Sequence, residues 1–357
     1  MKRKLILGLW LVLCIFLMAV TVLWVAVIKC YYDYHNIPVD YLIGNKPACV
    51  TALKETGFPF SFLVVGDTRT IATSEALMQM AVESGNHRFM IIVGDFVHRP
   101  TLGNHNFFLT EMATELKLPI PVFLVAGNHD ISYSTSKKKS KDPPMTPEMY
   151  DASYGPRNFD FVYNNCLFII VEVDRRNPEA YITYLNDTLS EKGMNKNHIF
   201  VFTHTPPDVL VDYIRTSFAY QDEFLALLEK YKVNTCFFGD YHSYWKGIRN
   251  GVTYIVSGGG GSRLRPKGFH HILKITVYKD KIFEGIIGTS AKSNLGHWFE
   301  EMIFTKILPP IKDSVWTIYL VLVILILCVG YALIKLIKCL NKQKTENHAD
   351  ITVNDKY

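Results

Sequence analysis

Short apolar runs alternate with amphipathic stretches through the middle of the chain. Apolar runs of about four to eight residues rich in β-branched and aromatic side chains predict strands, and apolar positions spaced by about 3.6 residues predict helices. The predicted strands are 60–65, 88–93, 121–126, 198–203 and 233–238, and the predicted helices are 74–83, 106–116, 179–191 and 222–231. Alternation of this kind is typical of an α/β protein with a largely parallel sheet.

Three predicted β-hairpins interrupt this alternation. They pair 159–163 with 166–173, 245–249 with 252–256, and 272–277 with 281–287. The second hairpin turns at Asn250-Gly251, the residue pair that a two-residue type I′ turn favours. Parallel strands together with hairpins predict two sheets packed face to face, with helices on the outside.

An uncharged apolar run lies near each end of the chain, at 5–28 and 315–334. A membrane-spanning helix needs about 20 such residues, so each run is long enough. The apolar core of a secretory signal peptide is usually about 7–15 residues long, and no small-x-small cleavage site follows the first run. We therefore interpret 5–28 as an uncleaved anchor, with a cleaved signal peptide as the alternative.

Basic residues predict how these spans are oriented. Lys2, Arg3 and Lys4 precede the first span, and four lysines follow the second. The positive-inside rule then places both termini in the cytoplasm and the main domain in the periplasm, the extracellular space or an organelle lumen. The predicted organisation is a cytoplasmic N-terminus (1–4), a transmembrane helix (5–28), a linker (31–59), the main domain (60–288), a juxtamembrane amphipathic segment (289–312), a transmembrane helix (315–334) and a cytoplasmic tail (335–357).

The net charge of +5 follows from this topology. The two cytoplasmic flanks hold eight of the 38 basic residues and three of the 33 acidic residues, so 30 of each sign remain elsewhere. A balanced main domain gives no reason to expect a nucleic-acid partner.

Polar groups suited to bind metals follow five of the predicted strands. They are Gly66-Asp67-Thr68-Arg69, Gly94-Asp95-Phe96-Val97-His98, Gly127-Asn128-His129-Asp130, His204, and Gly239-Asp240-Tyr241-His242. The carboxyl ends of strands in an α/β sheet converge on one edge, so we expect these side chains to meet. One such motif alone is commonly a turn. Five motifs with carboxylate, amide and imidazole donors predict a site for divalent Zn, Mn or Fe, with two ions about 4 Å apart sharing one carboxylate.

These motifs resemble those of the calcineurin-like metallophosphoesterases, a family that includes the purple acid phosphatases. The resemblance covers residues 60–288, and its most specific part is Gly94-Asp95 followed by Gly127-Asn128-His129-Asp130. It implies a four-layer αββα sandwich, flanked here by two transmembrane helices, and a site for two divalent metal ions. The implied activity is hydrolysis of a phosphate monoester or diester by attack of a metal-bound hydroxide. The two spans make a lipid-linked phosphate an attractive substrate.

The resemblance also implies a role for each site residue. Asp67 and His242 would hold the first metal, Asp95 would bridge both metals, and Asn128 and His204 would hold the second. His129 would act as an acid or electrostatic group beside the leaving oxygen. Asp130 would orient His129.

The first departure from the family pattern is Arg69, at a position where the family usually has a histidine ligand. Arginine stays protonated and cannot bind a metal, but its planar fork suits a phosphate oxygen. In the purple acid phosphatase branch the missing ligand is a tyrosine three residues after the bridging aspartate, and His98 has that position here. We therefore predict that His98 completes the first metal site, with a surface histidine as the alternative. An imidazole in place of a phenolate favours a divalent metal.

The second departure is Asp240, where the family usually has a histidine on the second metal. Aspartate is a legitimate ligand, and its charge would favour a harder ion such as Mn or Mg. The alternative is that Arg69 and Asp240 pair directly in the space of the lost ligands. The protein would then be a catalytically silent binding or sensor protein with the same fold.

Overall fold

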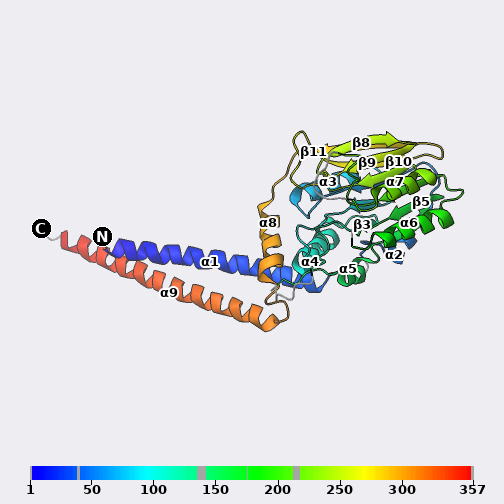
Figure 1. Cartoon of the computed structure of the whole chain (residues 1–357). Helices are drawn as coiled ribbons and strands as arrows, with labels where there is room; N and C mark the ends of the chain where they lie inside the picture. Colours follow the sequence, from blue (N-terminus) through cyan, green and yellow to red (C-terminus); the bar gives the residue numbers. More distant parts are fainter. Residues whose placement is uncertain (1, 38–40, 135–141, 175, 212–217, 355–357) are drawn as a thin grey trace. The chain divides into compact units, whose positions relative to one another are not determined.

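The computed structural model describes residues 2–37, 41–134, 142–174, 176–211 and 218–354. The chain divides into two compact units (Figure 1). One unit is Ile37–Glu301, and the other combines Met1–Asn36 with Met302–Tyr357. The first unit includes part of the predicted linker and the beginning of the predicted juxtamembrane segment. Each unit is described separately.

Two mixed sheets form the centre of the unit Ile37–Glu301. The first has the strand order β11-β10-β1-β2-β3, in which β1, β2 and β3 are parallel. The second has the order β4-β5-β6-β7-β9-β8, in which β5, β6, β7 and β9 are parallel. The strands of the first sheet are β1 (Phe60–Val65), β2 (Met90–Val93), β3 (Val122–Val125), β10 (His270–Val277) and β11 (Ile282–Thr289). Those of the second are β4 (Phe159–Tyr163), β5 (Cys166–Ile170), β6 (His198–Phe202), β7 (Thr235–Phe238), β8 (Tyr244–Arg249) and β9 (Val252–Ser257).

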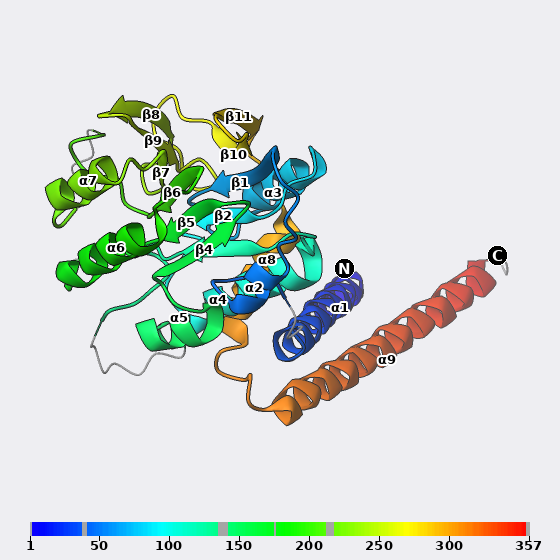
Figure 2. The ribbon, with the colours of Figure 1, turned by 90° about the vertical axis from the view of Figure 1, so that its right-hand side faces the viewer.

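Helices cover the outer faces of both sheets (Figure 2). α6 and α7 lie on the second sheet, whereas α3 and α4 pack on the first. The helices of this unit are α2 (Pro47–Thr51), α3 (Ala72–Glu83), α4 (Leu102–Thr110), α5 (Pro147–Tyr154), α6 (Pro178–Lys192), α7 (Gln221–Lys230) and α8 (Leu295–Met302), whose last residue is the first of the other unit. A π-helical segment, η1 (Glu111–Leu116), continues α4.

Three apolar interfaces separate the four layers. Alternate residues of β1 serve two of them, because successive side chains of a strand point to opposite faces. Leu63 and Val65 pack with Leu77 of α3, whereas Phe62 and Val64 pack against the second sheet. Leu185 of α6 and Phe224 of α7 bury the outer face of the second sheet. The predicted αββα sandwich is therefore confirmed.

Within residues 60–288 the predicted elements agree with the structure except in two regions, and α2 lies in the segment that was predicted as a linker. The helix predicted at 106–116 is α4 followed by η1, and it begins at Leu102. The helix α5 was not predicted. Its signals are local: Thr146 accepts a hydrogen bond from the Met149 N–H, and Pro147 occupies the first turn.

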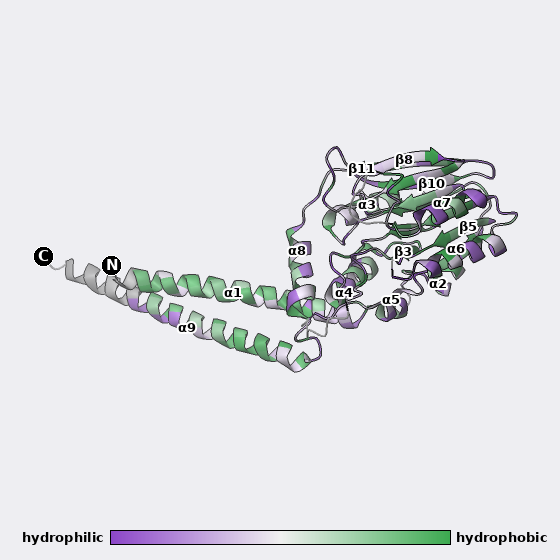
Figure 3. Cartoon of the chain, viewed as in Figure 1, coloured by the Kyte–Doolittle hydropathy of each residue, from purple (hydrophilic) through white to green (hydrophobic). Residues whose placement is uncertain are grey.

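The other unit contains two long apolar helices, α1 (Lys2–His35) and α9 (Val315–Asn354) (Figures 1 and 3). The segments Leu5–His35 and Val315–Lys342 have mean hydropathies of 3.0 and 2.9 and are long enough to cross a membrane. The Trp24 indole donates a hydrogen bond to the Ile318 carbonyl at 2.9 Å, so the two helices contact each other. A π-helical segment, η2 (Ile303–Ile307), belongs to the same unit. Length and composition thus suggest a membrane anchor at each end of the domain.

A buried histidine links α4 to α5 and to the loop after β3. His105 is 1% exposed. Its Nε2 lies 2.8 Å from the Asp130 carbonyl, and its Nδ1 lies 2.9 Å from the Tyr154 hydroxyl. Nε2 therefore donates to the carbonyl, and Nδ1 accepts from the tyrosine. Burial lowers the pKa of His105 to about 3, so the ring is neutral in the folded protein.

The aromatic core between the sheets yields a prediction about stability. Phe62 is fully buried, stacks on Phe89 at 5.1 Å, and makes edge-to-face contacts with Phe168, Phe200, Phe202 and Phe237. Phe62→Ala should lower the free energy of unfolding by about 3–5 kcal/mol, because the cavity cannot close between two sheets. Denaturant unfolding of the detergent-purified chain measures this loss. Phe283, 52% exposed, provides the control. Equal effects of Phe62→Ala and Phe283→Ala would contradict the prediction.

His105 yields a prediction about pH. Its folded-state pKa is depressed to about 3 from 6.5, so its contribution to stability is present above pH 6.5 and is lost as the pH falls from 6.5 towards 3. Between pH 6.5 and 5 the wild type should lose roughly 2 kcal/mol more unfolding free energy than His105→Gln, which keeps hydrogen-bonding groups but cannot titrate. Denaturant unfolding at each pH tests this, with His270→Gln as the control. Parallel curves for wild type and His105→Gln would show that His105 does not carry the acid sensitivity.

Candidate metal centre

The carboxyl ends of parallel strands from both sheets meet at one place. Asp67, Asp95 and Asn128 follow β1, β2 and β3, whereas His204 and Asp240 follow β6 and β7. Hydrogen bonds join the two groups directly, and in one of them the Asp240 N–H donates to Asp67 Oδ2 at 2.9 Å. The structure thus brings together residues that are 173 positions apart in sequence.

The first ligand cluster consists of Asp67, Asp95 and His242. Their ligand atoms all lie within 4.8 Å of one another. Asp67 Oδ1 is buried and receives no aligned hydrogen bond, although His242 Nε2 is 3.1 Å away. His242 Nδ1 bonds to the Arg263 carbonyl at 2.8 Å, and this bond directs Nε2 towards Asp67. A carboxylate oxygen buried in this way fits a metal ligand.

The second ligand cluster converges on Nε2 of His204. This nitrogen lies 3.2 Å from Asn128 Oδ1, 3.3 Å from Asp95 Oδ1 and 3.8 Å from Asp240 Oδ1. The other ring nitrogen bonds to the Val93 carbonyl at 2.8 Å, which fixes the ring. The carboxylate, amide and imidazole donors could hold a second divalent ion, and Asp95 belongs to both clusters.

Burial and charge act in opposite directions on this site. Burial raises the pKa of Asp67, partly offset by His242. For Asp95, burial also raises the pKa, but His204, His129 and Arg69 outweigh it and hold the pKa well below its usual range. Burial lowers the pKa of His204, yet Asp95, Asp240 and Asp67 together raise it well above its usual value. The clustered carboxylates therefore favour positive charge at the centre.

The backbone of the centre is strained. Asp67, Asp95, Asp240 and His242 have positive φ angles of 59°, 54°, 57° and 51°. Such angles are uncommon for residues other than glycine, and strain of this kind is concentrated at functional sites. The glycine before Asp240 is also required, because a Cβ on Gly239 would lie 2.5 Å from the Val93 carbonyl oxygen.

Arg69 pairs with the shared carboxylate. Its Nη2 lies 3.0 Å from Asp95 Oδ2, and its side chain is 16% exposed. The alternative that Arg69 pairs directly with Asp240 is wrong, because the arginine makes its ion pair with Asp95. Asp240 instead faces His204.

His98 does not join the first cluster as predicted. Its side chain is exposed, and its charged neighbours include Glu301, Arg69 and Arg99. The part of His98 that serves the centre is its carbonyl, which accepts a hydrogen bond from His129 Nδ1 at 2.9 Å. The structure therefore agrees with the alternative interpretation, in which His98 is a surface histidine and not a metal ligand.

Asp130 supports the backbone instead of the His129 ring. Its Oδ2 accepts hydrogen bonds from the N–H groups of Asp95 at 2.8 Å and Gly127 at 2.7 Å, and its Oδ1 accepts one from Val97 at 3.2 Å. The expected direct contact with His129 is therefore wrong; the His98 carbonyl orients that ring. Burial and the Asp95 charge raise the pKa of Asp130 to about 7.

Sequence reasoning missed His105, which donates a hydrogen bond to the Asp130 carbonyl. A single histidine inside an apolar helix resembles any core residue in sequence. Its role depends on α5, which was also missed. The hint in the sequence is a polar side chain inside an apolar helix, because such a side chain must find hydrogen-bond partners once it is buried. In the structure His105 is 1% exposed.

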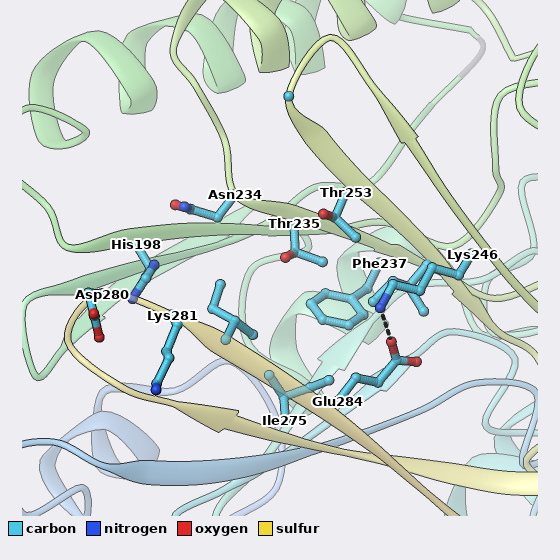
Figure 4. Close-up of a pocket in the computed structure, with 13 residues that line it drawn as sticks. His198, Asn234, Thr235, Phe237, Lys246, Thr253, Ile275, Asp280, Lys281 and Glu284 are labelled. Atoms are coloured by element: carbon cyan, nitrogen blue, oxygen red, sulfur yellow. Dashed lines mark hydrogen bonds and ion pairs between the residues drawn. The ribbon is translucent and has the colours of Figure 1, made fainter.

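A cavity of about 280 Å³ lies at the other end of the strands (Figure 4). His198 and Thr235, at the amino ends of β6 and β7, line it, and Lys246 forms an ion pair with Glu284 across it at 2.8 Å. None of the predicted site residues lines this cavity. It is separate from the metal centre.

Solved structures that are similar to this chain include two phosphatases. A purple acid phosphatase from yellow lupin (Lupinus luteus) seeds is 14% identical with a TM-score of 0.52, and the match covers 65% of this chain and 52% of the lupin chain. This chain therefore spans about half the length of that enzyme. A dimetal phosphatase from Danio rerio is 13% identical with a TM-score of 0.49, covering 65% of this chain and 97% of the other. No curated protein matches.

The sequence pattern of one family matches over residues 60–244, which is 185 of 357 residues and so more than half of the chain. The matched region runs from β1 to the start of β8 and contains every residue of the two ligand clusters. The chain belongs to the calcineurin-like phosphoesterase family.

Proposed function

We propose that the protein is a membrane-anchored, metal-dependent phosphoesterase that hydrolyses a phosphate monoester or diester outside the cytoplasm. The observation that carries this proposal is the convergence of Asp95, Asn128 and Asp240 on the Nε2 of His204. Members of the family are generally metal-dependent hydrolases, so the fold and the donor set point to the same chemistry.

We assign two metal sites that share Asp95. Asp67 and His242 complete the first site, and the ligands of the second are Asn128, His204 and Asp240. Two bound divalent cations would supply positive charge for the phosphoryl oxygens and lower the pKa of a water molecule. The carboxylates Asp67, Asp95 and Asp240 are buried at this centre, and they would offset the positive charge of the two cations.

We propose that His129 handles the proton of the leaving group. Its side chain is 33% exposed, and Nε2 lies 3.9 Å from Asp95 Oδ2. Because Nδ1 donates to the His98 carbonyl, Nε2 is the ring nitrogen on the side of Asp95. A protonated Nε2 can donate to a leaving oxygen or stabilise its charge.

We propose that Arg69 binds a phosphate oxygen. Nη2 of Arg69 donates a hydrogen bond to Asp95, and the other N–H groups of the guanidinium can donate to a phosphate. The fixed planar fork then offers a phosphate a charge-assisted contact beside the metals.

A second candidate function is a silent binding or sensor protein. The observation that favours it is also the Arg69–Asp95 pair, because the guanidinium occupies Asp95 Oδ2, an oxygen that a bridging ligand uses. If Arg69 replaces the first metal, the fold would bind a phosphorylated ligand without hydrolysing it.

The two candidate membrane spans support the cellular placement. We infer that both termini are cytoplasmic, because lysine and arginine flank the spans on those sides. A site tethered near a bilayer favours a lipid-linked phosphate as substrate.

Hydrolysis tests the enzyme proposal. The purified full chain, supplied with Mn, Zn or Fe, should cleave an aryl phosphate or a bis-aryl phosphate diester. His129→Ala should lower kcat by roughly a hundredfold or more, because general acid catalysis typically contributes that much. His270→Ala serves as a histidine control outside the centre. If the wild type shows no more activity than His129→Ala, the enzyme proposal is wrong.

Metal content separates the two candidate functions. Asp240→Asn should lose about one equivalent of bound metal relative to wild type, because it removes a charged ligand of the second site. Elemental analysis after dialysis against Mn or Zn gives the count per chain, with the exposed Asp187→Asn as a matched control. Equal metal content in wild type and Asp240→Asn would favour the silent protein or exclude Asp240 as a ligand.

A further inference from the structure

A second cluster of possible ligands lies among the helices outside the first sheet. It consists of Glu75 on α3, Glu111 at the start of η1 and His297 on α8. One ligand atom from each lies within 4.8 Å of the other two. None of the three belongs to the metal centre described above.

The cluster is buried and poorly satisfied by the protein. Glu111 is 4% exposed and His297 is 6% exposed. Glu75 Oε1 and His297 Nε2 lie 2.6 Å apart, but they are not aligned as a hydrogen bond, and neither has another hydrogen-bond partner in the described part of the chain. Buried polar atoms without partners are costly, so their concentration at one point needs a physical explanation.

The buried negative charge of the cluster also favours a bound cation. Burial, then the charge of Glu75 and a side-chain hydrogen bond to it, raise the pKa of Glu111. Two carboxyl groups side by side in a buried site are costly when both are charged. A divalent cation would offset both carboxylate charges at once.

We propose that Glu75, Glu111 and His297 bind a divalent cation, with Zn²⁺ as the best fit. Two carboxylates and one imidazole form a mixed oxygen and nitrogen donor set that zinc accepts, with a remaining position for water. Small side-chain rotations would bring the three atoms to the usual ligand distances of about 2.0–2.2 Å.

The local helix geometry supports this site. The α-helix α4 changes to π-helical winding at Glu111 itself. Single π-helical turns are rare and occur frequently at functional sites, where they re-aim a side chain. The change of winding thus coincides with the most deeply buried carboxylate of the cluster.

The cation would act as a structural cross-link. α8 is the last helix of the unit Ile37–Glu301, and the chain continues from it towards the apolar helix α9. Thr73 and Lys292 exchange two hydrogen bonds at 2.9 and 3.2 Å, and the His297 ring packs against Phe107 at 5.0 Å. A cation bound by α3, η1 and α8 would fasten the same segment more firmly.

The cross-link would also bear on the edge of the metal centre through Glu301. Glu301 lies one helical turn after His297, and its charge acts on His98. The His98 carbonyl in turn holds His129. The site would therefore have a positioning role for the region that carries the proposed acid group.

Metal counting on the full chain in detergent tests the proposal. After dialysis against Zn²⁺, Glu111→Gln and His297→Gln should each retain about one equivalent fewer than wild type. Glu83→Gln, an exposed position on α3, should retain the wild-type content. Glu111 and His297 lie outside the proposed catalytic centre. Loss of one equivalent of Zn²⁺ in their variants can therefore be distinguished from loss of metal binding or activity at the catalytic centre.

A ligand-exchange variant covers the case in which the glutamine variants do not fold. His297→Cys would place a thiolate in the cluster, and loading with Co²⁺ should then produce a thiolate-to-cobalt charge-transfer absorption that wild type lacks. This band, or loss of one Zn²⁺ in the glutamine variants, is the expected result. Unchanged Zn²⁺ content in folded glutamine variants, or a folded His297→Cys without the band, would show that the three residues share only protons.

Discussion

A buried carboxylate that accepts only backbone hydrogen bonds holds the metal centre in place. Asp130 receives N–H groups from Asp95, Val97 and Gly127, and so ties the loop after β2 to the loop after β3. These hydrogen bonds fix main chain rather than a side chain, and they are strongest when the carboxylate is ionised. The positions of Asp95, Asn128 and His129 all depend on this clamp. His105 then secures the clamp by donating to the Asp130 carbonyl.

Much of the fold and the clustering of the ligands could be predicted from the sequence. The strand ends are marked by apolar runs followed by Gly-Asp or Gly-Asn, and sheet geometry alone brings the ends of parallel strands to one edge. Asp67, Asp95, Asn128, His204 and Asp240 meet for that reason. The required glycines are part of the same signal, because close backbone approach leaves no room for a Cβ.

The remaining details depend on tertiary packing that local patterns do not encode. The spacing of His98 after Asp95 suggested a ligand, but the chain turns so that its carbonyl, rather than its ring, serves the centre. Asp130 was expected to contact the adjacent His129, yet it accepts three backbone N–H groups, two of which come from 33 and 35 positions away. The meeting of Glu75, Glu111 and His297 likewise requires three helices from distant parts of the chain.

The two oxygens of Asp67 have different partners, and this couples the relative position of the two sheets to the spacing of the ligands. One of its oxygens accepts the Asp240 N–H from the opposite sheet, while the other faces His242. A slide of one sheet over the other would stretch that bond and change the spacing of the ligands together. The aromatic layer between the sheets resists such shear, since close-packed interiors deform little and transmit strain. Packing far from the centre would thereby affect the affinity of this edge of the sandwich for the divalent ions that we propose it binds.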